Sequence, residues 1–142
     1  FYQQSLKISE EIGEKRIQIA SLDGLGKTYL NQGDMNSAQD CLLMALRDAT
    51  SANLLPQALD SLASLGRLHA GLGEATLALA LLSYVIQHPA SPEHARQAAQ
   101  SQLDQLKAGL AADVIATAFQ AAQGLTLGSL LERLETLSGD ER

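Results

Sequence analysis

The stretch Ser21-Leu22-Asp23-Gly24-Leu25-Gly26 recurs forty residues later as Ser61-Leu62-Ala63-Ser64-Leu65-Gly66. The same offset pairs four more positions that carry identical or similar residues: Lys27 with Arg67, Gly33 with Gly73, Asp34 with Glu74, and Ala38 with Ala78. A repeat at a fixed period of this size is typical of arrays that stack one supersecondary unit. The sequence therefore predicts a chain built from a repeated unit.

The glycines indicate what each unit is. Gly26 and Gly66 lie inside helical patterns, where Gly costs about 1 kcal/mol relative to Ala, and we expect each to let a second helix approach closely. Gly33 and Gly73 end helical stretches, as a glycine just beyond a helix commonly does. An acidic residue follows each of these two and is favourable at the start of the next helix. Each unit is predicted to be two helices joined by a tight turn.

The composition favours an all-α fold and excludes some partners. Aromatic residues make up 4% of the 142 residues, there is no Trp, and Ala and Leu dominate. This mixture favours packed helices over a β-sandwich. The formal net charge of −6 disfavours binding to nucleic acid or to an anionic membrane. No run reaches the roughly 18 apolar residues of a membrane span. We expect neither nucleic acid nor a membrane as a partner.

The pattern of glycines, Leu and Ala resembles the signature of the tetratricopeptide repeat (TPR) family. The second unit departs from that signature at His69, where Tyr is usual, and at Val85, where Ala is usual. The resemblance implies a right-handed α-solenoid of antiparallel helix hairpins with a C-terminal helical cap. It is carried by Leu22, Leu25, Gly26, Tyr29, Gly33, Ala38, Leu42 and Ala45, and by Leu62, Leu65, Gly66, His69, Gly73, Ala78, Leu82 and Val85.

The resemblance divides the chain into four parts. Residues 1–13 are expected to be the second helix of a truncated repeat, 14–53 and 54–90 two TPR repeats, and 91–142 the capping helices. Ser91-Pro92-Glu93 is typical of a helix start. A last helix is predicted from an apolar stripe at helical spacing, which comprises Leu127, Leu130, Leu131, Leu134 and Leu137.

The stretch from Tyr2 to Arg16 is similar to a linkage common in TPR arrays of bacterial signalling proteins, among them signal-transduction ATPases of the STAND type and transcriptional regulators with TPR tails. That similarity implies the ligand-sensing C-terminal part of a larger signalling protein, with a cytoplasmic location.

In the TPR family the first helix of each repeat lines a concave groove. Lys27 and Arg67 occupy equivalent places in successive first helices, so we hypothesise that they grip a carboxylate or an acidic peptide. Two solvated cations on an exposed face remain an equal alternative. The Lys/Asn set of chaperone-binding TPR domains is not reproduced. The positions that the family pattern assigns to the groove are Asp23, Lys27, Leu30, Asn31, Asp60, Ala63, Ser64, Arg67 and Ala70.

The remaining polar residues form no recognisable catalytic or metal-binding motif. His88 and His94 flank a Pro-containing turn, but their spacing fits no zinc pattern. His69 is expected to be a hydrogen-bonded interior residue. Gly26-Lys27-Thr28 lacks the first glycine and the preceding strand of a phosphate-binding loop. We expect no enzyme activity, no metal and no cofactor.

The sequence thus predicts a module that binds a protein or peptide, or other domains of its own chain, and that is monomeric. The alternative is a structural scaffold without a ligand groove, which would self-associate through the truncated N-terminal end.

Overall fold

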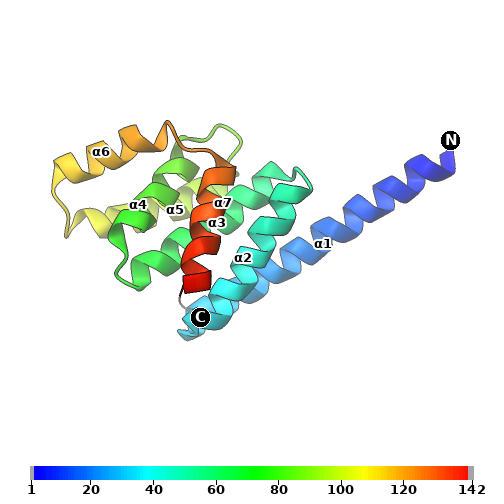
Figure 1. Cartoon of the computed structure of the whole chain (residues 1–142), viewed down its shortest axis with the longest axis horizontal. Helices are drawn as coiled ribbons and strands as arrows, with labels where there is room; N and C mark the ends of the chain where they lie inside the picture. Colours follow the sequence, from blue (N-terminus) through cyan, green and yellow to red (C-terminus); the bar gives the residue numbers. More distant parts are fainter. Residues whose placement is uncertain (1, 141–142) are drawn as a thin grey trace.

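The computed structural model describes the backbone of residues 2–140 and the side chains of residues 10–137. Across residues 2–140 all regular structure is α-helical, which confirms the all-α fold class (Figure 1). The helices are α1 (Tyr2–Gln32), α2 (Met35–Ser51), α3 (Leu55–Gly71), α4 (Ala75–Gln87), α5 (Glu93–Lys107), α6 (Ala112–Ala122) and α7 (Leu127–Asp140).

The first three turns share one backbone geometry. Each contains a residue with a left-handed backbone, with φ of 83° at Gly33, 57° at Asn53 and 80° at Gly73. The next N–H then donates to a carbonyl five residues earlier, as from Asp34 N to Tyr29 O at 2.9 Å. Such bonds satisfy the last carbonyls of the preceding helix. The helix ends predicted at Gly33 and Gly73 are confirmed.

Successive helices pack against one another along the chain. α1 packs on α2, α2 on α3 and α3 on α4, and α3 also contacts both α1 and α5 (Figure 1). The helices α1, α3 and α5 therefore lie beside one another. Between the helices is a core of small and branched apolar side chains, in which Leu42, Leu46, Leu59, Leu62, Leu65, Leu68, Leu81 and Leu82 are fully buried.

Two glycines lie where the paired helices meet. A Cβ atom at Gly26 would lie 2.6 Å from Cγ of Leu42, and one at Gly66 would lie 2.7 Å from Cδ2 of Leu82. Both leucines are fully buried, so neither can move into solvent to make room. Each glycine therefore permits the close approach of a second helix, as the sequence predicted.

The N-terminal helix differs from the expected division at residue 13. α1 continues from Tyr2 to Gln32 without a break, so no turn separates residues 1–13 from residues 14–32. Gly13 alone does not end a helix, since it costs about 1 kcal/mol there, and no Pro is nearby. We also expected residues 1–9 to belong to a second helix of a repeat. That comparison depends on their side chains, which lie outside the described residues.

The segment expected to cap the array consists of two parts. α5 and α6 extend the stack, because α5 contacts α3 and α4 while α6 packs on α4. α7 instead crosses back onto α2, where Leu130 and Leu134 are buried and Arg47 Nε lies 3.0 Å from Glu135 Oε1. The rest of the predicted leucine stripe, Leu127, Leu131 and Leu137, packs against the same core.

No single helix among the described residues is long and apolar enough to cross a membrane. α6 and the Leu127–Leu137 part of α7 reach that length and composition only as a pair, which is bent by 115°.

The contact at Gly26 can be tested against Gly24, which lies on the same helix with no atom within 4 Å of its added Cβ. We expect Gly24→Ala to raise the free energy of unfolding by about 0.5–1 kcal/mol through helix propensity. Gly26→Ala should lower it by about 1–3 kcal/mol, because the new methyl group overlaps Leu42. Urea unfolding monitored by circular dichroism measures both changes. Equal effects at the two positions would show that the helices do not meet at Gly26.

The packing of α7 on α2 predicts a large difference between two neighbouring residues. Leu134→Ala should destabilise the fold by about 2–4 kcal/mol, because Leu134 is 2% exposed. Glu135→Ala removes only an exposed ion pair and should change stability by about 0.5 kcal/mol or less. If both variants melt like the wild type, α7 is not docked.

Candidate binding groove

Side chains of α1, α3 and α5 line a hollow of about 370 Å³, which we call the groove. Eight of the lining residues carry polar groups that could contact a ligand: Lys27 and Asn31 from α1, Asp60, Ser64 and Arg67 from α3, and His94, Ser101 and Gln102 from α5. Ala63 and Ala98 leave space between them, because their side chains are single methyl groups. The groove is therefore open, and most of the residues that line it carry a polar group.

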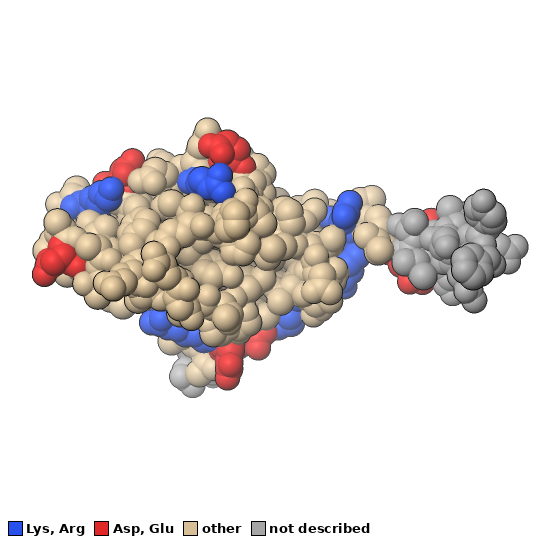
Figure 2. All heavy atoms as spheres, turned by 90° about the horizontal axis from the view of Figure 1, so that it is seen from above, with Lys and Arg blue, Asp and Glu red and all other residues tan. Residues whose placement is uncertain are grey.

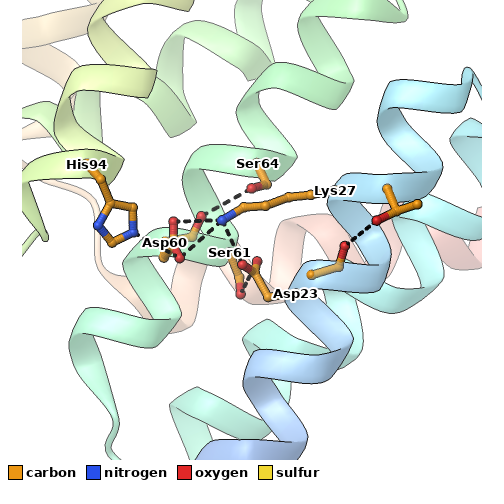
Figure 3. A network of polar contacts seen from close by, with 8 residues as sticks. Asp23, Lys27, Asp60, Ser61, Ser64 and His94 are labelled. Carbon is orange, nitrogen blue, oxygen red and sulfur yellow. Dashed lines mark hydrogen bonds and ion pairs between the residues drawn. The ribbon is translucent and has the colours of Figure 1, made fainter.

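At one end of the groove, two carboxylates converge on one ammonium group (Figure 3). Lys27 Nζ lies 2.8 Å from Asp23 Oδ2 and 3.3 Å from each carboxylate oxygen of Asp60. Asp23 is buried and also accepts a hydrogen bond from Ser61 Oγ at 3.2 Å. The contacts join equivalent faces of α1 and α3.

Two groups have shifted pKa values in this cluster, which is formed by Asp23, Lys27 and Asp60: they are Asp23 and Lys27. Burial raises the pKa of Asp23 and outweighs the hydrogen bond from Lys27, and the charge of Asp60 adds to the increase. Burial acts to lower the pKa of Lys27, but its hydrogen bonds and charge interactions with Asp23 and Asp60 together raise it. One ammonium group thus serves two carboxylates, and it does not fully compensate for the burial of Asp23.

His94 extends this cluster to α5. Its Nε2 atom lies 3.2 Å from Asp60 Oδ2, and 69% of its side chain is exposed. Asp60 thus stands between Lys27 on one side and His94 on the other (Figure 3). The acidic end of the groove offers carboxylate oxygens and an imidazole, which suit a positively charged group or a hydrogen-bond donor.

The other end of the groove is basic. Arg67 Nη2 donates a hydrogen bond to Asn31 Oδ1 at 2.8 Å, and both side chains are exposed. Among residues 10–137 no carboxylate lies close enough to Arg67 for an ion pair. Arg67 also borders a second hollow, lined by Ala70 and Gln102. The free edge of its guanidinium group can therefore receive a carboxylate.

The structure brings most of the predicted groove residues together. Asp23, Lys27, Asn31, Asp60, Ser64 and Arg67 all lie in or beside the groove. Leu30 is different, since it is 6% exposed and belongs mainly to the core. The hypothesis of two available cations fails for Lys27, because Asp23 and Asp60 already neutralise it.

Sequence reasoning missed the contribution of α5, since residues 91–142 were interpreted as a cap. His94, Ser101 and Gln102 form the far wall of the groove. The helix start at Ser91-Pro92-Glu93 and the small residues Ala95, Ala98 and Ala99 were the available signal. They indicated a further helix that could pack closely on the preceding pair.

The other histidines have local roles. His88 Nδ1 accepts a hydrogen bond from Ala90 N at 3.0 Å and so stabilises a turn. His69 is 1% exposed, and its Nδ1 lies 2.9 Å from Glu74 Oε2. Its Nε2 atom has no hydrogen-bond partner among the residues that the structure describes, so only half of the expected hydrogen bonding is found there. The described residues contain no cluster of three or more His, Cys, Asp or Glu that could hold a metal ion.

The cluster at Lys27 predicts a pH-dependent variant. Lys27→Met leaves Asp23 buried without its counter-ion and should cost about 1–2 kcal/mol at pH 7, a value reduced because 39% of the Lys27 side chain is exposed. The pKa of Asp23 rises further in the variant, so the folded state takes up a proton while the pH is still above the ordinary value of 3.8, and the penalty is relieved by the time the pH reaches that value. The difference from wild type should therefore shrink in acid and grow toward neutral pH.

Urea unfolding of the wild type and of Lys27→Met, from pH 7 down to the ordinary pKa of 3.8, measures how their difference in stability changes with pH. The double variant Asp23→Asn with Lys27→Met is the control, because it removes the unpaired charge and should recover most of the loss. A pH-independent deficit in Lys27→Met would show that packing of the lysine stem, and not its charge, is what matters.

Comparisons of the chain with protein-family models, with curated proteins and with solved structures found no match.

Proposed function

We propose that the chain is a TPR-type helical-repeat module that binds a segment of another protein in the groove. The observation that carries the proposal is the arrangement of polar side chains from three neighbouring helices around one open hollow. The forty-residue repeat and its two glycine contacts support the TPR assignment. The absence of a recognisable catalytic motif in the sequence favours binding over catalysis.

The charges of the groove favour a ligand of mixed charge. Arg67 and Asn31 suit a carboxylate, whereas Asp60 and His94 suit a basic side chain or another donor. This refines the hypothesis of an acidic peptide ligand, since Lys27 is already paired. Such complementarity contributes more to specificity and register than to raw affinity.

The setting of the module is also a proposal. The similarity of the stretch from Tyr2 to Arg16 to bacterial signalling arrays supports a ligand-sensing part of a larger cytoplasmic signalling protein. In that setting the ligand segment would come either from a separate protein or from another domain of the same chain.

The test is selection of peptides from a random displayed library on the immobilised 142-residue chain, followed by fluorescence anisotropy of the enriched sequences. We expect enriched peptides to carry Asp or Glu together with Lys or Arg. Arg67→Glu should weaken their binding about tenfold or more, because a charge-assisted hydrogen bond contributes about 1.5–3 kcal/mol.

Arg16→Glu is the matched control, because Arg16 is exposed on α1 but does not line the groove. It makes the same change in charge and should leave affinity within about twofold. No enrichment, or equal loss in both variants, would refute the groove as the binding site.

A further inference from the structure

The segment between Lys107 and Glu132 carries a single charged residue, Asp113, although much of it lies at the surface. Within it, α6 consists mostly of apolar residues, with Asp113, Thr117 and Gln120 as the exceptions, yet Ala122 is its only buried residue. A helix with so many apolar residues ordinarily buries a wider face. Figure 2, seen from the side of the molecule on which α6 lies, shows a broad face without Lys, Arg, Asp or Glu except near its edges.

Two sides of α6 have different surroundings. Ile115, Phe119 and Ala122 are partly or fully buried, and Phe119 O accepts a hydrogen bond from Gln87 Nε2 of α4 at 3.0 Å. The other side, which carries Val114, Thr117 and Ala121, remains exposed, and 46% of Val114 is accessible to solvent. The exposed positions recur every three to four residues, so they form a second apolar stripe.

This second stripe forms one wall of a surface hollow of about 400 Å³, which we call the apolar cleft. Thr76, Leu79 and Ala80 of α4 also line it, and α7 contributes Arg133. α6 packs on α4 and α7 packs on α2. Because these two helices pack on different partners, the apolar cleft remains open between them.

Two opposite charges border the apolar cleft. Asp113 lies on α6 and Arg133 on α7, and neither side chain forms an ion pair with any residue from 10 to 137. They also do not pair with each other, although both line the same hollow. An acid and a base held apart on one apolar surface make that surface complementary to a copy of itself, because a two-fold axis places each charge opposite the other.

We propose that the apolar cleft is the contact surface of a symmetric dimer of this chain. Val114 of each copy enters the cleft of the other, and Asp113 of each copy pairs with Arg133 of the other. The apolar stripe supplies the burial, and the two ion pairs fix the register. Each chain has a net charge of −6, so the pairs also offset a repulsion that would oppose association. The proposal does not depend on ligand binding in the groove.

Sedimentation equilibrium of the 142-residue chain over a wide concentration range measures the dimer dissociation constant. Asp113→Arg alone places two arginines opposite each other at both contacts of the symmetric dimer. Arg133→Asp alone places two aspartates opposite each other there. Each should raise the dissociation constant by about a hundredfold. The double variant, with both changes, restores both pairs with reversed polarity and should return the constant to within about tenfold of wild type.

The matched controls are Glu14→Arg and Arg16→Asp, which make the same charge changes at exposed positions of α1. They should leave the dissociation constant unchanged within about threefold, and circular dichroism should show wild-type helix content for all variants. A chain that is monomeric at every concentration would overturn the proposal. This holds even if the chain binds phospholipid vesicles, as measured by flotation, because the apolar cleft would then contact lipid and not a second copy. A dimer that survives both single reversals, or that the double variant fails to rescue, would also overturn it.

Discussion

The stack of helices depends on the absence of a side chain at Gly26 and Gly66. A single added carbon would overlap the buried Leu42 or Leu82, so each pair of helices can approach this closely only over a glycine. Because the two contacts occupy the same place in each repeat, α2 approaches α1 as α4 approaches α3. Equivalent positions of α1 and α3 then face the same side, which is why Lys27 meets Asp60 and Asn31 meets Arg67.

The groove follows from this alignment. Of its two cations, Lys27 serves stability and Arg67 is available for recognition. Lys27 forms ion pairs with Asp23 and Asp60 and so connects α1 to α3. Its positive charge is therefore already neutralised and is not available to a ligand. Arg67, at the equivalent position one repeat later, has only the amide of Asn31 as a partner among the described side chains and presents its remaining donors to the groove. One pattern position therefore serves structure in the first repeat and is available for binding in the second.

The sequence predicted the features that depend on local chemistry. Gly33 and Gly73 mark turns because few other residues adopt positive φ, and Gly26 and Gly66 mark close contacts because an interior helical glycine otherwise only costs stability. It could not predict features that depend on which helices become neighbours. Lys27 and Asp60, which form an ion pair, are 33 residues apart in the sequence. Where α7 packs on α2, Arg47 pairs with a glutamate that is 88 residues away in the sequence. The boundary between the two repeats was expected after residue 53, but the left-handed backbone of Asn53 was not predicted, since Asn is common in many settings.

The chain thus presents two separate surfaces, a polar groove on α1, α3 and α5 and an apolar cleft on α4, α6 and α7. The central claim is that the groove is the one that recognises a protein segment. A crystal structure of the chain with a selected high-affinity peptide tests this most directly. The account predicts a peptide that crosses α1, α3 and α5 with a carboxylate on Arg67 and a donor beside Asp60. A peptide seated on α2 or in the apolar cleft, with the groove empty, would contradict it.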